Sequence, residues 1–136
     1  MTGTLVVDAS AALRLAVDGP GSAEVVAALA TAEVLVAPSL YVAEVANALW
    51  KYVRAGLLDV ATADANVNDL VELIGRFEEM DAGLASKALA LAARFDHSAY
   101  DAIYAVTASE NHAVLATVDT RLAALANHVG VATIPR

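Results

Sequence analysis

The sequence predicts an α/β fold with a central, mainly parallel sheet that is covered by helices on both faces. Short apolar runs alternate along the chain with longer segments of helical periodicity, and turn residues separate the two kinds of segment. Such alternation is typical of parallel strands joined by right-handed helical crossovers. The chain has 136 residues, of which 59% are hydrophobic and only 5% aromatic. This composition suits a single domain over residues 1–136 with a core of small aliphatic side chains.

The first half of the chain is expected to form two buried strands, each followed by helices. The strands are short apolar runs of the kind found in sheets that are buried on both faces. Ser22 follows a turn cluster and is predicted to cap a helix, and Gly56 stands where a helix usually ends. In chain order, the predicted elements are a strand at 5–8, helical turns from Ser10, a helix at 22–31, a strand at 34–37, and helices at 38–55 and 61–74.

The second half is expected to continue the same alternation. Ser98 is predicted to cap a helix, because serine before an apolar helical pattern is a favourable N-cap. In chain order, the predicted elements are a weak extended piece at 77–80, helices at 82–94 and 98–111, a strand at 113–118, a short helix at 120–126 and a final strand at 129–134. The apolar stretch near the end of the long helix is interpreted as core and comprises Trp50, Tyr52, Val53, Leu57 and Leu58.

Four acidic residues occupy positions that indicate a shared site. Asp8 closes the first strand and Asp119 follows a later one, so both lie at the carboxyl edge of the sheet, where ligands bind in such folds. Glu44 and Asp101 each lie in a helix that is otherwise mostly apolar, and charged groups are rarely buried without a partner. Taken singly, Asp101 has the alternative role of a capping acid paired with Ser98, and Glu44 that of a surface acid.

Acids that gather at one edge repel one another, so each needs either a raised pKa or a nearby cation. Mg²⁺ or Mn²⁺ is the expected cation, because both ions prefer hard oxygen ligands, activate water and neutralise phosphodiester charge. The net charge of −8, from 8 basic and 16 acidic residues, argues against a protein that coats nucleic acid through a basic surface. A metal would instead bring phosphate to an acidic pocket.

Four segments of the chain, in this order and at these intervals, resemble the motifs of one nuclease family. They are Leu5-Val6-Val7-Asp8-Ala9-Ser10-Ala11, Glu44-Val45-Ala46-Asn47, Tyr100-Asp101-Ala102-Ile103-Tyr104 and Leu115-Ala116-Thr117-Val118-Asp119-Thr120-Arg121-Leu122. The chain is similar in these segments to PIN-domain nucleases, and among them to the VapC-type toxin ribonucleases of type II toxin–antitoxin pairs. The resemblance implies a three-layer α/β/α fold and a divalent-metal-dependent endoribonuclease. It also implies a homodimer and a cognate antitoxin as partner. In toxins of this kind, the region of the long helix is used both for dimerisation and for binding the antitoxin.

The resemblance also implies roles for individual residues in the hydrolysis of RNA. The catalytic and metal-binding set would be four acids: Asp8, Glu44, Asp101 and Asp119. The supporting set, which would orient carboxylates or a metal-bound water, would be Ser10, Asn47 and Thr117. The family often has further acids after the fourth one, whereas Thr120 and Arg121 stand here. The sequence therefore leaves open whether the site holds one metal ion or two.

Three basic residues near these positions are candidates for contact with RNA: Arg14, Lys51 and Arg121. Their alternative roles are solvated surface charges or partners of the site's own acids. The three histidines, at positions 97, 112 and 128, show no paired spacing typical of metal ligands, and none is a good candidate for a general base.

Several alternatives remain or are excluded at this point. The chain has no cysteine, which excludes disulfides and thiolate metal sites and is compatible with the cytoplasm. No signal peptide is expected from Met1-Thr2-Gly3-Thr4. No membrane span is expected either, because the apolar runs are interrupted before the ~20 residues that one needs.

A haloacid-dehalogenase-type phosphatase is disfavoured because Ser10 stands where its second Asp belongs. A PIN-like module that binds RNA or protein without cleavage stays open as the alternative function.

Overall fold

The computed structural model describes residues 3–136, which form a five-stranded sheet in which all strands are parallel. The strand order is β3-β2-β1-β4-β5. The strands are β1 (Thr4–Val7), β2 (Val34–Pro38), β3 (Arg76–Glu78), β4 (Val114–Ala116) and β5 (Thr133–Ile134). In the central register, Leu5 of β1 lies between Leu35 of β2 and Val114 of β4. The predicted parallel sheet is confirmed.

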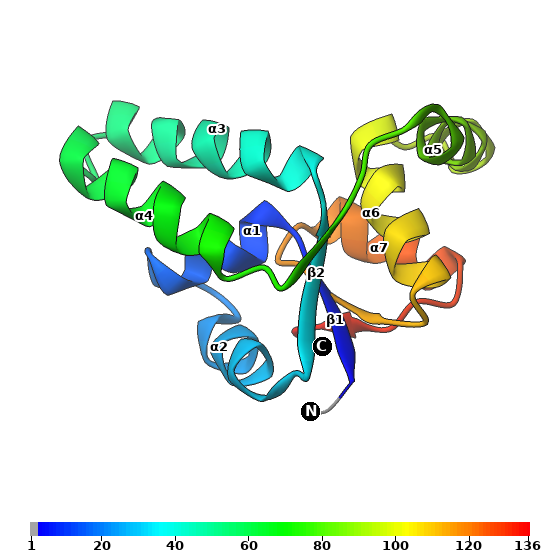
Figure 1. Ribbon diagram of the computed structural model, residues 1–136, viewed down its shortest axis with the longest axis horizontal. Helices are drawn as coiled ribbons and strands as arrows, with labels where there is room; N and C mark the ends of the chain where they lie inside the picture. Colours follow the sequence, from blue (N-terminus) through cyan, green and yellow to red (C-terminus); the bar gives the residue numbers. More distant parts are fainter. Residues whose placement is uncertain (1–2) are drawn as a thin grey trace.

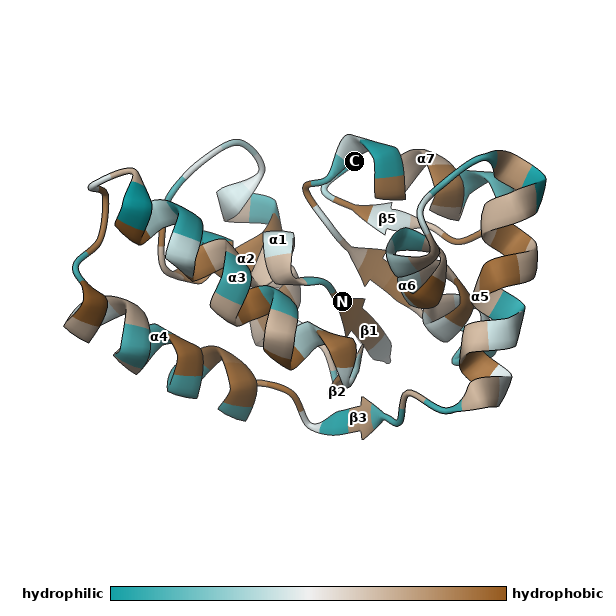
Figure 2. Cartoon of the chain, turned by 90° about the horizontal axis from the view of Figure 1, so that it is seen from above, coloured by the Kyte–Doolittle hydropathy of each residue, from teal (hydrophilic) through white to brown (hydrophobic). Residues whose placement is uncertain are grey.

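Helices cover both faces of this sheet and complete a three-layer arrangement (Figures 1 and 2). On one side lie α1 (Ala9–Ala12), the 3₁₀ turn η1 (Leu13–Leu15), α2 (Ser22–Thr31), α3 (Leu40–Arg54) and α4 (Val60–Glu72). On the other side lie α5 (Ala82–Phe95), α6 (Ala99–Glu110) and α7 (Thr120–His128). The strands end toward the top of Figure 1, where α1 begins after β1 and α3 after β2.

The central strand is buried on both faces because each face packs on its own layer of helices. Leu5 and Val7 pack in one apolar cluster with the side chains of α1–α4. Val6, which points the other way, packs in a second cluster that includes Tyr104 of α6 and Leu122 of α7. The last three residues of β1, Leu5, Val6 and Val7, are 0% exposed, so the carboxyl end of β1 holds Asp8, which follows it, in a fixed position.

Several helix ends are set by local chemistry, and one differs from the prediction. Ser98 is the N-cap of α6, and its hydroxyl accepts a hydrogen bond from the Asp101 amide at 3.1 Å, as predicted. Gly56 follows α3 with a φ of 78°, the left-handed conformation in which glycine is favoured. The prediction that Ser22 caps α2 is wrong: Gly21 is the cap residue, and the Ser22 hydroxyl instead accepts from the Gly19 amide at 2.9 Å.

The apolar stretch at the end of α3 is only partly core, which corrects the sequence interpretation. Tyr52, Val53 and Leu58 pack against the cluster beneath α3 and α4. Trp50 and Leu57, in contrast, are 53% and 64% exposed. The sequence pattern does not separate these residues, because large apolar side chains on a helix that packs along one side look alike whether they face the core or solvent.

Between residues 3 and 136, no helix has the length and apolar character needed to cross a membrane. Met1 and Thr2, which belong to the segment considered for a signal peptide, lie outside the described residues.

Tyr41 joins α3 to α4 through a buried hydrogen bond. The side chain is 0% exposed, and its hydroxyl donates to the Leu70 carbonyl at 2.8 Å. Tyr41→Phe is expected to lower the free energy of unfolding by roughly 1–2 kcal/mol, because the buried carbonyl loses its donor. Urea unfolding measures the change. Tyr52→Phe is the control and is expected to be nearly neutral, and an equal loss in both variants would contradict this role for the Tyr41 hydroxyl.

Candidate active site

The four predicted acids come from four different elements and act on one another at the carboxyl edge of the sheet. Asp8 follows β1, Glu44 lies in α3, Asp101 in the first turn of α6, and Asp119 directly before α7. The charge of Asp119 raises the pKa of each of the other three carboxyl groups, and the charge of Asp101 also raises that of Glu44. The tertiary structure therefore brings all four acids into one electrostatic cluster.

Asp8 is the most buried and most tightly held member of this cluster. It is 5% exposed and is the N-cap of α1, where Oδ1 accepts from the Ala11 amide at 2.8 Å. The Ser10 hydroxyl lies 2.8 Å from Oδ1 and 2.9 Å from Oδ2. The Thr117 hydroxyl donates to Oδ2 at 2.5 Å. These contacts hold the carboxylate in one orientation.

Burial raises the pKa of Asp8 to about 6, against the opposing effect of its hydrogen bonds from Thr117, Ala11 and Ser10. The charge of Asp119 raises it further. A carboxylate that remains hard to ionise despite three hydrogen-bonding neighbours lacks a compensating positive charge. A cation at this edge would supply that charge.

Ser10 and Thr117 also connect the ends of two neighbouring strands. The Ser10 hydroxyl accepts from the Val118 amide at 3.0 Å, and the Thr117 hydroxyl accepts from the Asp119 amide at 3.0 Å. The same two hydroxyls contact Asp8. Asp119 in turn caps α7, with Oδ1 accepting from the Arg121 amide at 2.9 Å and from the Leu122 amide at 3.2 Å. The spacing between Asp8 and Asp119 is thus set by a continuous hydrogen-bond network.

Glu44 is half-buried, and burial raises its pKa. Its proximity to the Tyr104 hydroxyl has the opposite effect, and the charges of Asp101 and Asp119 raise the pKa again. The Tyr104 hydroxyl is buried, and it makes no well-formed hydrogen bond with any part of the chain that the structure describes. Its contact with Glu44 is therefore chiefly electrostatic. Sequence reasoning did not single out Tyr104, because a tyrosine on an apolar helix face looks like ordinary core.

Asp101 serves both as a first-turn helix residue and as a member of the cluster. Its backbone amide is capped by Ser98, whereas its carboxylate faces His97, with 3.9 Å between Oδ2 and Nδ1. Burial raises the pKa of Asp101 and Asp119 raises it further, while His97 and Arg121 lower it. His97 lies in the loop before α6, and its side chain is only 12% exposed.

The predicted supporting and basic residues lie around this cluster in different ways. Asn47 lines a small hollow together with Glu44 and is exposed. Arg14 and Lys51 line a hollow of about 440 Å³ that reaches Ser10. Arg14 is held there by a hydrogen bond from Nε to the Pro20 carbonyl at 3.1 Å. Arg121 acts on Asp101 by its charge, so it is a partner of a site acid as well as a candidate for contact with RNA.

The donor set suits a hydrated divalent ion better than a fully protein-coordinated one. Across residues 3–136, no three acidic or histidine side chains already stand close enough together to hold a metal ion. Mg²⁺ commonly keeps several water ligands and binds through one or two carboxylates. A buried carboxylate beside further acids whose pKa values are raised fits such an ion, with the remaining acids acting through water.

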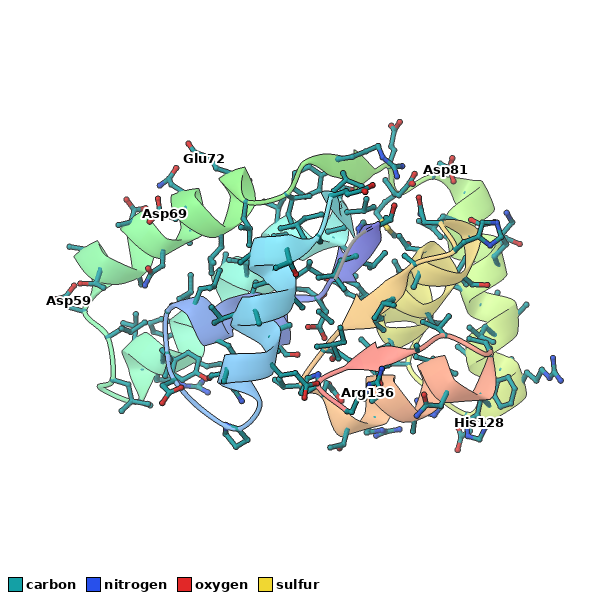
Figure 3. All side chains as sticks on the ribbon, turned by 90° about the horizontal axis from the view of Figure 1, so that it is seen from below. Asp59, Asp69, Glu72, Asp81, His128 and Arg136 are labelled. Atoms are coloured by element: carbon teal, nitrogen blue, oxygen red, sulfur yellow. The ribbon has the colours of Figure 1, made fainter. Side chains whose placement is uncertain are left out.

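Three further acids and one histidine lie away from the acid cluster. Asp59, Asp69 and Glu72 belong to the α4 segment and point outward from it (Figure 3). His128 ends α7 and stacks on Phe95, with 5.0 Å between the ring centroids. The excess of acidic residues is therefore not confined to the candidate site.

Comparison with known proteins identifies the family. Residues 5–128 match the PIN domain. The chain is 36% identical over 120 residues to Ribonuclease VapC3 from Pyrobaculum aerophilum, which covers 88% of this chain and 92% of that protein.

Two solved structures share the fold. The crystal structure of PAE2754 from Pyrobaculum aerophilum superposes with a TM-score of 0.69 and 26% identity, covering 96% of this chain and 89% of that one. Mycobacterium tuberculosis VapC20, described as a sarcin-ricin loop cleaving toxin, gives a TM-score of 0.67 at 20% identity, covering 88% and 93%. From its motifs, its parallel sheet and these matches, the chain belongs to the PIN-domain family and is a relative of the VapC ribonucleases.

Proposed function

We propose that this protein is a divalent-metal-dependent endoribonuclease and acts as the toxin of a toxin–antitoxin pair. The observation that carries the proposal is the cluster itself: Asp119 acts electrostatically on three other acids, and one of them, Asp8, is buried with its pKa raised to about 6. A fold has no structural need for such a cluster, because like charges destabilise one another. The relation to a protein named Ribonuclease VapC3 supports RNA as the substrate.

In this proposal the four acids hold Mg²⁺ or Mn²⁺, directly or through water, and Asp8 is the best ordered of them. The ion, when bound, supplies positive charge against the phosphodiester and acidifies water for attack on phosphorus. Ser10 and Thr117 keep the Asp8 carboxylate in one orientation through their hydroxyls. Arg14 and Lys51, which share a hollow beside Ser10, contact the RNA backbone. Asn47, one helical turn beyond Glu44 in α3, helps to orient a carboxylate or a metal-bound water.

The proposed partners are a cognate antitoxin and a second copy of the chain, in the cytoplasm. Support comes from the exposed apolar side chains near the end of α3, where Trp50 and Leu57 are 53% and 64% exposed. Exposed apolar residues of this size are typical of protein interaction surfaces.

The test is cleavage of a panel of RNAs by the purified chain with Mg²⁺, with Mn²⁺ and with EDTA. Cleavage is expected only with metal. Asp101→Asn is expected to lower the cleavage rate by roughly two orders of magnitude or more. The substitution weakens the binding of a metal ion whose charge stabilises the transition state by several kcal/mol. Asp69→Asn, an acid on the outer side of α4, is the matched control and should cleave like the unmodified protein.

The alternative function is a PIN-like module that binds RNA or a protein without cutting. It would be supported if the unmodified protein binds RNA but cleaves none of the panel with either metal. Equal cleavage by the unmodified protein and Asp101→Asn would indicate a contaminating nuclease and would refute the catalytic proposal.

A further inference from the structure

Beside the acid cluster, a hollow of about 310 Å³ lies between the start of α3 and the start of α6. It is lined by Leu40, Ala43, Glu44, Asn47 and Tyr100. Its volume is at the lower end of small-ligand pockets, which measure roughly 300–1,000 Å³. Glu44 belongs to both the hollow and the acid cluster, so a ligand here would lie directly beside the cleavage site.

Tyr100 gives this hollow an exposed aromatic face. The side chain is 62% exposed, although it directly precedes Asp101 in the first turn of α6. The Tyr100 side chain makes no ring contact and no hydrogen bond with the remainder of residues 3–136. An exposed aromatic ring beside a nuclease site is a platform on which an unpaired nucleobase can stack.

Asn47 supplies the polar group that such a platform needs for recognition. It is exposed, one helical turn beyond Glu44, and its side-chain amide is not hydrogen-bonded to any other described residue. An amide has both donors and an acceptor and is suited to the edge of a base.

The charges of the hollow favour a base over a phosphate. Of the residues that line it, none is basic and one, Glu44, is acidic. The hollow beside Ser10 instead contains Arg14 and Lys51. The negative charge of Glu44 would repel a phosphate in the hollow beside Tyr100, whereas Arg14 would attract one in the hollow beside Ser10. A neutral base carries no charge for Glu44 to repel.

We propose that Tyr100 and Asn47 form a nucleobase subsite, in which an unpaired base next to the scissile phosphate stacks on the Tyr100 ring and meets the Asn47 amide at its edge. The inference rests on the proposed ribonuclease function, since it takes RNA as the ligand. It adds a way in which this chain would select an unpaired nucleotide at the cleavage point.

The test is binding of single-stranded RNA 12-mers that carry the fluorescent base 2-aminopurine at successive positions, with Ca²⁺ as an oxygen-coordinating ion. The full chain is expected to quench 2-aminopurine at one position. Tyr100→Phe should retain the quenching, whereas Tyr100→Leu, which keeps an apolar side chain without a ring, should lose it and bind roughly 10-fold or more weakly. Asn47→Ala should weaken binding without removing the quenching. Leu89→Ala, at an exposed position of α5, should change neither.

Three results would overturn the subsite: no binding of single-stranded RNA by the unmodified chain, equal binding by Tyr100→Leu, or a change in oligomeric mass in Tyr100→Leu with RNA affinity unchanged. The last result would show that Tyr100 belongs to a protein interface. Cleavage assays on the same variants separate the two proposals. Cleavage without dependence on Tyr100 rejects only the subsite, and Tyr100-dependent binding without any cleavage rejects only the ribonuclease function.

Discussion

Asp8→Asn is expected to lower the rate of RNA cleavage sharply and, at the same time, to stabilise the metal-free protein at pH 7.5. The variant removes a buried charge whose pKa is raised from 3.8 to about 6. Such a shift corresponds to a cost of roughly 3 kcal/mol for the ionised form in the folded state. Asparagine has nearly the same size and can keep an acceptor toward the Ala11 amide. A gain of roughly 1–3 kcal/mol in the free energy of unfolding is therefore expected.

The loss of cleavage follows from the central place of Asp8 in the proposed metal site. The cleavage rate is expected to fall by roughly three orders of magnitude, because the charge of the bound ion stabilises the transition state by several kcal/mol. Urea unfolding in EDTA and cleavage with Mn²⁺ measure the two effects separately. Asp69→Asn should leave the free energy of unfolding and the cleavage rate unchanged within experimental error. A less stable Asp8→Asn would show that the charge is already compensated in the fold, and unimpaired cleavage would remove Asp8 from the site.

Mn²⁺ at about 100 times its dissociation constant is expected to raise the melting temperature at pH 7.5 by roughly 10 °C, which corresponds to about 2.7 kcal/mol of linked binding energy. The shift should shrink strongly at pH 5. Burial and neighbouring charges raise the pKa of Asp8, Glu44 and Asp101, so protons compete with the metal at the lower pH.

The metal-free protein should show the opposite dependence on pH. A carboxyl group with a raised pKa in the folded state binds its proton more tightly there than in the unfolded chain. The contribution of Asp8 to stability therefore falls as the pH rises from about 4 to about 6, and then levels off. Thermal unfolding in EDTA and in Mn²⁺ at several pH values measures both trends. A shift of equal size at pH 5 and pH 7.5, or an equal shift in Asp101→Asn, would contradict a metal held by these carboxylates.

Much of the fold was predictable because its signals are local. The apolar run before Asp8 identified the central strand, and the alternation of strands and helices identified the parallel sheet. The serine before α6 was predicted to cap the helix, because a cap requires only a side chain and an amide three residues apart. The last strand was predicted as residues 129–134 but comprises only Thr133–Ile134, since its length depends on pairing with β4.

The candidate site was predictable to a lesser depth. The positions of Asp8 and Asp119 followed from the rule that sites form at the carboxyl edge of a parallel sheet. Glu44 could equally have been a surface acid, and Asp101 only a capping residue. Tyr104 and Tyr100 were noted only as parts of a motif. Glu44 lies in α3, whereas Asp101, Tyr100 and Tyr104 lie in α6, more than 40 residues further along the chain. Their mutual contacts therefore form only when the two helices pack together.

The sequence by itself determined the parallel sheet, its main elements and the residues that carry the PIN-domain motifs, because these depend on periodicity, capping and the order of segments. Only the tertiary structure decided how the four acids interact, with Asp8 buried and Asp119 acting on the other three. It also decided that Trp50 and Leu57 face solvent and that Tyr100 and Asn47 share a hollow. Burial and electrostatic interaction depend on distances between side chains from different elements, and those distances are set only when the helices pack on the sheet.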